Sequence, residues 1–270
     1  MSIKSITSRD NPQLKAIKQL ATSAQARKKA GQTLLDGIHL CQTWLQQQGA
    51  PALCVVGEAA RGLPEVARIM ADCQARQVSC LLLPDALFAG LSQVDNGVAL
   101  LFLIDIPKTL AVPRLTQSAL LLDQLQDPGN LGSILRSAAA AGIEQVFCSS
   151  GTVFAWSPKV LRAGMGAHFA LQIFEQVDLE ALIKAATVPV WATSSYATRS
   201  IFEADLTAPL AWIFGHEGQG VTPALLALAN VAVKIPQSKN VESVNVAAAV
   251  AVCVFEQLRQ SAQRGKAHST

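Results

Sequence analysis

The polar segment that contains Asn130 and Arg136 joins a short apolar run to a helical pattern. Residues 119–123 are apolar enough to fill the core of a parallel sheet, and residues 134–141 have the spacing of a helix. This arrangement predicts that Asn130 and Arg136 lie just beyond the carboxyl end of a strand. Open α/β sheets bind their ligands at that edge, so we interpret the segment as part of a site.

Two later segments repeat the pattern of a strand followed by a polar turn. Residues 213–221 predict a strand that enters a glycine-rich turn, and residues 231–236 predict a third strand, which precedes a long alanine-rich helix. Neither half of the chain has Gly-x-Gly-x-x-Gly after its first strand, and there is no Walker sequence, so binding of nicotinamide or of nucleoside triphosphate is disfavoured. The glycines of the turn are Gly215, Gly218 and Gly220.

The order of these motifs resembles the SpoU (TrmH-like) family of RNA ribose 2′-O-methyltransferases, in the SPOUT superfamily. The motifs are Asn-x-Gly-x-x-x-Arg, Gly-x-Glu-Gly-x-Gly, and Ile-Pro followed by Glu-Ser-x-Asn-Val, within residues 119–260. The resemblance implies S-adenosylmethionine as cofactor, methylation of a ribose in structured rRNA or tRNA, and a homodimer formed through the carboxyl-terminal domain. It also implies a deep trefoil knot, which general rules of topology would not predict.

Arg136 is the residue that we expect to act on the ribose. A guanidinium stays charged in proteins, so it suits phosphate binding and stabilisation of a negative 2′-oxygen better than removal of a proton. A surface arginine paired with a carboxylate would give the same pattern. Asn130 would orient Arg136 or the ribose, or cap the helix, and Glu217 would fix the direction of Arg136 or remain solvated.

The start of the last helix supplies two further candidates. Ser243 and Asn245 are of types that cap helices, whereas the resemblance implies hydrogen bonds to substrate or a catalytic role.

The cofactor site is expected at the glycine-rich turn. Glycines let a backbone approach a ligand closely, although a tight turn needs them for its conformation alone. The resemblance adds Ile235, Val244 and Asn245 to the cofactor-binding residues. Lys239 occupies a position where family members have glycine, which puts cofactor affinity in doubt or supplies a contact with RNA phosphate.

The first thirty residues form a basic patch, which attracts phosphate backbones but is equally typical of a solvated helix face. We take Lys28 and Lys29 as candidate RNA-binding residues. The resemblance adds Arg162, in a segment similar to the family's Arg-Ala-Ser-x-Gly-Ala. The patch contains Lys4, Arg9, Lys15, Lys18, Arg27, Lys28 and Lys29, opposed only by Asp10.

The pattern of strands and helices predicts two α/β domains. Residues 1–105 resemble a ribosomal-protein-like RNA substrate-binding domain, 106–117 form a linker with two prolines, and 118–270 form the methyltransferase domain with a parallel sheet. Strands are predicted at 33–36, 52–56, 78–83, 97–103, 118–123, 145–148, 188–193, 211–214 and 231–235. Helices are predicted from residue 12, and at 39–48, 64–75, 84–91, 131–141, 158–163, 179–186, 223–228 and 242–260.

Composition sets broad limits. The chain has 270 residues, of which 50% are hydrophobic and 15% charged, with a net charge of +3, as expected of a folded α/β protein. The longest apolar run, 246–255, is far shorter than the roughly 20 residues that span a bilayer. The polar start favours a cytoplasmic location. The six cysteines are predicted to be reduced and structural, and the histidine and cysteine spacing offers no metal site.

The sequence leaves one competing function open. An RNA-binding or assembly factor could keep the fold and lose methyl transfer through the region of Lys239. Binding of S-adenosylmethionine distinguishes the enzyme from this factor.

Overall fold

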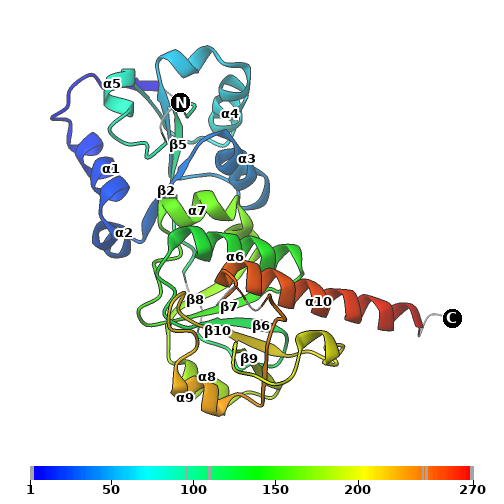
Figure 1. Ribbon diagram of the computed structural model, residues 1–270. Helices are drawn as coiled ribbons and strands as arrows, with labels where there is room; N and C mark the ends of the chain where they lie inside the picture. Colours follow the sequence, from blue (N-terminus) through cyan, green and yellow to red (C-terminus); the bar gives the residue numbers. More distant parts are fainter. Residues whose placement is uncertain (1–2, 95–96, 109–110, 239, 241–242, 268–270) are drawn as a thin grey trace. The chain divides into compact units, whose positions relative to one another are not determined.

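The chain forms two compact units (Figure 1). The computed structural model describes residues 3–94, 97–108, 111–238, 240 and 243–267. The first unit contains Met1–Lys108 and Trp156–Phe169, and the second contains Thr109–Ala155 and Ala170–Thr270. No helix in these described ranges has both the length and the apolar character needed to cross a membrane.

The first unit is built on a mixed sheet in the order β1-β4-β3-β5-β2. β1, β4 and β3 are parallel, and β5 runs antiparallel to β3 and β2. Asn11 caps the first helix by accepting hydrogen bonds from the backbone of Gln13 and Leu14, as the Asn-Pro pair predicted. The strands are β1 (Ile3–Ser5), β2 (Gln32–Asp36), β3 (Leu53–Gly57), β4 (Cys80–Leu83) and β5 (Leu100–Asp105), and the helices are α1 (Pro12–Thr22), α2 (Ala24–Ala30), α3 (Ile38–Gln47), η1 (Ala59–Gly62), α4 (Pro64–Ala75) and α5 (Asp85–Phe88).

A segment from the second half of the sequence belongs to this first unit. It carries α7 (Pro158–Gly164) and most of η2 (Ala167–Ala170). The hydroxyl of Thr33 donates to the carbonyl of Trp156 over 2.7 Å, and the rings of Trp44 and Phe169 meet edge to face at 5.2 Å. These buried contacts explain why residues 156–169 depart from the expected continuous division at residue 118.

The second unit contains a six-stranded sheet in the order β11-β9-β10-β6-β7-β8, and every paired neighbour is parallel. The predicted parallel sheet is therefore confirmed for this unit. Figure 1 shows α6 and α10 along one face and α8 and α9 along the other. The strands are β6 (Ala119–Leu122), β7 (Gln145–Ser149), β8 (Gln172–Val177), β9 (Val190–Thr193), β10 (Ala211–Phe214) and β11 (Val231–Val233), and the helices are α6 (Pro128–Ala140), α8 (Leu179–Lys184), η3 (Ile201–Glu203), α9 (Pro223–Leu228) and α10 (Val246–Ala267).

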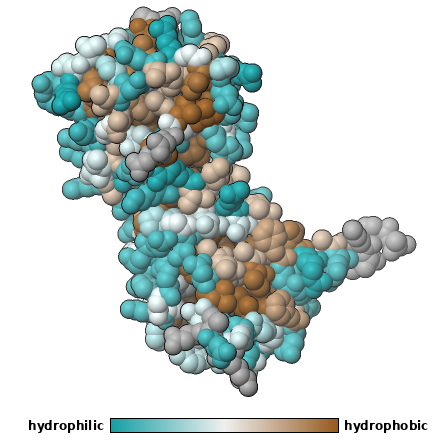
Figure 2. Space-filling model, turned by 45° about the horizontal axis from the view of Figure 1, so that its top comes forward, coloured by the Kyte–Doolittle hydropathy of each residue, from teal (hydrophilic) through white to brown (hydrophobic). Residues whose placement is uncertain are grey.

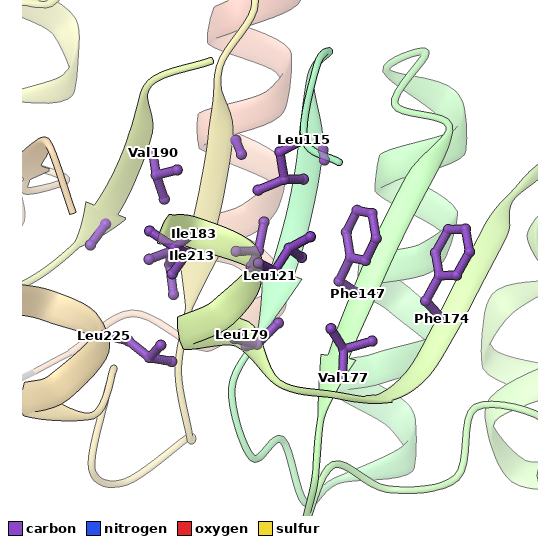
Figure 3. Packing of buried hydrophobic residues seen from close by; sticks show 14 residues of the cluster. Leu115, Leu121, Phe147, Phe174, Val177, Leu179, Ile183, Val190, Ile213 and Leu225 are labelled. Atoms are coloured by element: carbon purple, nitrogen blue, oxygen red, sulfur yellow. The ribbon is translucent and has the colours of Figure 1, made fainter. Parts of the chain in front are cut away.

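The core beneath this sheet forms where alternate strand residues meet α8 and α9 (Figure 3). The rings of Phe147 and Phe174 stack at 4.8 Å, and both are almost fully buried. Leu115 is also fully buried there, and its carbonyl accepts hydrogen bonds from Thr187. The end of the expected linker 106–117 is therefore anchored in the second unit.

Six elements were missing from the sequence prediction: β1, β8, α2 and the short 3₁₀ helices η1, η2 and η3. β1 has only three residues, the buried residue of α2 is Arg27, and β8 is an edge strand with exposed polar positions. Such short or half-polar segments have weak periodicity. All six cysteines are free and buried, which confirms their predicted role as small apolar residues.

Candidate functional site at the carboxyl edge of the second sheet

The parallel order of the second sheet gathers the loops that carry the motifs. β10 lies between β6 and β9, and β11 pairs with the far side of β9. Since parallel strands end at the same edge, the segments that follow β6, β10 and β11 all leave the sheet there. The motifs are thus positioned by the strand order, not by their separation in sequence.

The first motif forms the start of α6. Asp127 is the cap, because its carboxylate accepts a hydrogen bond from the backbone N–H of Asn130 over 2.7 Å, and Pro128 occupies the first turn. The alternative that Asn130 caps this helix is therefore wrong. Its side chain is free to make contacts away from the helix.

Glu217 connects the glycine-rich turn to this helix start. One carboxylate oxygen accepts from the backbone N–H of Asp127 over 3.0 Å and from the side-chain amide of Asn130 over 3.1 Å, and the other accepts from the N–H of Gln126 over 3.2 Å. Burial raises the pKa of Glu217, but these hydrogen bonds to the charged form outweigh burial and leave the pKa below its ordinary value. The carboxylate is therefore ionised near neutral pH.

Asn245 brings the third motif to the same place. Its side-chain amide donates to the side-chain oxygen of Asn130 over 2.9 Å. Its own oxygen caps α10 by accepting from the backbone of Ala247 over 2.9 Å and of Ala248 over 3.3 Å. The capping role that the sequence offered for Asn245 is thus confirmed, and a contact with substrate stays a prediction. Glu217, Asn130 and Asn245 form one chain of hydrogen bonds, called here the Glu-Asn-Asn network.

The glycine-rich turn folds back on itself at residues 215–220. A side chain at Gly215 would overlap with the backbone of Gly220 and Val221, and Gly220 has φ +73°. The N–H of Gly220 donates to the carbonyl of His216 over 2.8 Å, and the N–H of Gly218 donates to Nδ1 of His216 over 2.9 Å. The structure therefore confirms that the conformation of the turn needs glycine at positions 215 and 220; close approach to a ligand stays a prediction.

Arg136 lies on the exposed face of α6. Within the described ranges it takes part in no ion pair, so the alternative of a surface arginine paired with a carboxylate is not observed. The expected pairing with Glu217 is absent as well, because the carboxylate of Glu217 accepts from the start of α6 instead. The guanidinium is left available to solvent and ligand.

The remaining residues of the third motif are accessible. Ile235 is half-buried after β11, and Ser243 and Val244 are exposed immediately before α10. Ser243 does not cap the helix, since Asn245 does. Lys239 lies outside the described residues, and with it the question of the family glycine. The predicted helix start at residue 242 is wrong, because Ser243, Val244 and Asn245 are not helical and α10 begins at Val246, after its cap Asn245.

The predicted RNA-binding residues of the first unit differ in exposure. Lys28 and Lys29 are exposed in the last turn of α2. Arg27 is buried and donates to the carbonyl of Leu20 over 2.6 Å, so it belongs to the fold and not to the basic surface. Arg162 is half-buried in α7 near Asp36, also within this unit.

Asp123 is a site residue that the sequence analysis missed. It is 2% exposed at the end of β6, with one oxygen accepting from the N–H of Thr222 and the other from the hydroxyl of Ser149. The available signal was a charged residue directly after an apolar strand, at the edge where ligands bind.

The site suits S-adenosylmethionine through its backbone. The turn at 215–220 exposes Gly218 and Gly220, and among the described residues an added Cβ at Gly220 would meet nothing within 4 Å. Adjacent peptide groups of this kind can bind an adenosine and an amino-acid group. In the described part of the chain there is no cluster of three or more His, Cys, Asp or Glu side chains able to hold a metal ion.

The fold and this edge define an α/β protein whose candidate site lies at the carboxyl ends of parallel strands. The description SpoU rRNA Methylase family matches residues 117–255, which is about half of the chain and includes all three motifs. The chain belongs to this family.

Similar proteins cover almost the whole chain. A protein of Synechocystis, named as an uncharacterized tRNA/rRNA methyltransferase, is 36% identical over 96% of this chain and 94% of its own length. A 23S rRNA guanosine 2′-O-methyltransferase of Bacillus subtilis is 31% identical over 94% of this chain and 98% of its own length. The crystal structure of an rRNA methyltransferase from Sinorhizobium meliloti with bound AdoMet is 26% identical, with a TM-score of 0.83 over 95% of this chain and 98% of that one.

We predict that Glu217→Gln weakens binding of S-adenosylmethionine by roughly tenfold. A glutamine has one acceptor oxygen for the three donors that bind Glu217, and its NH₂ group would face a backbone N–H, which is itself a donor. Isothermal titration measures this loss, and Gln219→Ala, an exposed change in the same turn, is the control. Equal affinity of Glu217→Gln and wild type would contradict the role of the carboxylate.

The lowered pKa of Glu217 also gives the sign of a pH effect. A carboxyl group whose pKa is lowered by folding stabilises the folded state above its ordinary pKa of 4.5, and this contribution disappears as the pH falls through the lower, folded value. The free energy of unfolding should therefore fall less steeply in acid for Glu217→Gln than for wild type.

Proposed function

We propose that the chain transfers a methyl group from S-adenosylmethionine to the 2′-hydroxyl of a ribose in structured ribosomal or transfer RNA. The observation that carries this proposal is the Glu-Asn-Asn network, which joins all three motifs of the SpoU family at the carboxyl edge of one parallel sheet. The names of the relatives, which include a 23S rRNA guanosine 2′-O-methyltransferase, support RNA ribose as the acceptor.

The cofactor is proposed to lie against the turn at 215–220 and the segment before α10. Gly215, Gly218 and Gly220 offer peptide groups, and Ile235, Val244 and Asn245 would complete the surface from the other side. When bound, S-adenosylmethionine supplies a methyl group activated by a positively charged sulfur. The protein's contribution is to hold that group in line with the acceptor oxygen and to keep both in place.

Arg136 is proposed as the catalytic residue at the ribose. It is exposed, and no carboxylate in the described ranges neutralises it. A guanidinium donates in a planar fork, which matches a phosphate next to the modified ribose and strengthens as charge develops on the 2′-oxygen. We do not assign it removal of the proton, because arginine retains its own charge in proteins.

Asn130, Glu217, Ser243 and Asn245 are proposed to shape the acceptor side. The amide of Asn130 is committed at both ends, to Glu217 and to Asn245, so its orientation is fixed. Ser243 is exposed beside Asn245 and offers a hydroxyl that can both donate and accept. These groups would direct the ribose, while Glu217 holds the start of α6 and with it the helix that bears Arg136.

The first unit is proposed to bind RNA, through Lys28 and Lys29 on α2 and with Arg162 on α7. Their charge would attract phosphates without reading sequence. We also propose the division into an RNA-binding domain, a linker and a methyltransferase domain, with the difference that residues 156–169 fold with the first unit. Lys239 would add a phosphate contact near the cofactor.

The trefoil knot and a cytoplasmic location are further proposals that rest on the family. Hydrogen bonds from the N–H of Lys234 to the carbonyl of Arg199 and from the N–H of Ile201 to the carbonyl of Lys234 join the exit of β11 to the loop after β9. A crystal structure in which no part of the segment 190–260 passes through a loop of the chain would contradict the knot. Cell fractionation tests the location.

We predict that Arg136→Ala abolishes most methyl transfer and leaves the fold and cofactor affinity unchanged, since the side chain contributes to neither. Ribose methylation is mapped across the RNA of cells that lack this protein and carry either wild type or the variant. Arg259→Ala, on the exposed face of α10, is the control. One ribose should be methylated in the cells that carry wild type and not in those that carry Arg136→Ala. Full methylation of that ribose by Arg136→Ala would show that Arg136 has no part in the mechanism. Failure of wild type to bind S-adenosylmethionine would favour the non-catalytic RNA-binding factor.

We predict that replacing Lys28 and Lys29 with alanine weakens RNA binding and lowers the slope of log K against log salt by about one to two. The change removes two exposed positive charges from the last turn of α2. Filter binding over a range of salt concentrations measures the slope, with Lys184→Ala in the second unit as the control. An unchanged slope would show that these lysines are only solvated.

A homodimer through the carboxyl-terminal domain is proposed because α10 leaves apolar side chains exposed. Phe255 is 44% and Leu258 41% exposed, and Figure 2 shows hydrophobic residues beside the projecting part of this helix. A second copy of the helix would cover them. We predict that Phe255→Ser with Leu258→Ser shifts a dimer to monomer in sedimentation, whereas Tyr196→Ser does not. A wild-type monomer at high concentration would contradict the dimer.

A further inference from the structure

Asp123 has a buried carboxylate and lies beside both ends of the glycine-rich turn. The backbone N–H of Asp123 donates to the carbonyl of Phe214, directly before the turn, over 2.8 Å. One oxygen of its side chain accepts from the N–H of Thr222, directly after Val221, over 3.0 Å. A single residue of the neighbouring strand thus holds both ends of the turn.

Hydrogen bonds, and not an ion pair, satisfy this buried side chain. It is 2% exposed, and none of the ion pairs within the described ranges includes it. A buried carboxylate is costly unless donors satisfy it. The second oxygen accepts from the hydroxyl of Ser149 over 3.3 Å, and the Ser149 oxygen in turn accepts from the N–H of Gln124 over 2.9 Å.

The turn itself cannot supply this constraint. Its internal hydrogen bonds, from Gly220 and Gly218 to His216, close the loop but do not fix it to the sheet. Glu217 fixes the tip to the start of α6. Loss of the carboxylate would leave the exit at Thr222 with an unpaired N–H and free the glycines to adopt other conformations.

We propose that Asp123 is a positioning residue that preorganises the glycine-rich turn for the cofactor by clamping its exit. This rests on the proposed function, in which the turn binds S-adenosylmethionine. Asp123 does not touch the reacting atoms; its effect reaches the cofactor through the backbone of residues 215–222. Binding to a preorganised loop avoids the entropic cost of ordering it.

The test compares Asp123→Ala with Asp123→Asn. We expect Asp123→Ala to raise the Kd for S-adenosylmethionine about ten- to a hundredfold, with kcat at saturating cofactor changed much less than KM. Asp123→Asn keeps an acceptor for Thr222 and should recover most of the affinity. Ser149→Ala is the control, because it removes the partner of the other oxygen and leaves the clamp on Thr222 intact.

Hydrogen–deuterium exchange without cofactor provides a readout independent of activity. Backbone amides of residues 215–222 should exchange faster in Asp123→Ala than in wild type and Asp123→Asn. A folded Asp123→Ala with wild-type affinity and exchange would overturn the proposal, as would an Asp123→Asn as impaired as Asp123→Ala. If wild type binds no S-adenosylmethionine, the proposed function fails, and exchange alone still decides whether Asp123 holds the turn.

Discussion

The carboxylate of Glu217 accepts hydrogen bonds from three donors in the segment that opens α6. These bonds join the glycine-rich turn to the start of α6 and hold the site together. Without the carboxylate, the backbone N–H groups of Gln126 and Asp127 would lack a partner within the protein, and the amide of Asn130 would be free to rotate. Because Asn130 also accepts from Asn245, a change at Glu217 would reach the cap of α10. The exposed guanidinium of Arg136 depends on the same helix.

The sheet makes this interaction possible. β6 and β10 are parallel neighbours, so the segments that follow them leave the sheet side by side, although they are more than eighty residues apart in sequence. Asp123 and Glu217 then fix the glycine-rich turn from both directions, the first at its ends and the second at its tip. The sheet thus holds the flexible glycine backbone in one conformation, as recognition of a cofactor through peptide groups requires.

Much of the second unit was predictable, because its central strands β6, β7 and β10 are largely apolar and fully buried, and the glycines and caps mark their ends. Residues Asn130, Glu217 and Asn245 were named from motif order alone. Their mutual bonds were not, since the sequence offered Arg136 as the partner of Glu217. Asp123 was not predicted, because a carboxylate after a strand is usually exposed to solvent, and its donors, Ser149 and Thr222, come from distant parts of the sequence.

The first unit was less predictable for a different reason. Arg27 was included in the basic patch, yet its guanidinium is buried and donates to the carbonyl of Leu20. A sequence does not show whether an arginine lies on the surface or is buried in the fold. Residues 156–169 join this unit through long-range contacts with β2 and α3 that leave no local signal. The identity of the RNA depends likewise on surface shape, which one sequence does not display.

The central claim is that the Glu-Asn-Asn network joins three segments distant in sequence into one site, which responds as a unit when the cofactor binds. Hydrogen–deuterium exchange of the wild-type protein, with and without saturating S-adenosylmethionine, tests it most directly. The account predicts that amides in residues 126–132, 215–222 and 243–248 become protected together. Protection of one segment alone, or of none while the cofactor binds elsewhere, would contradict it.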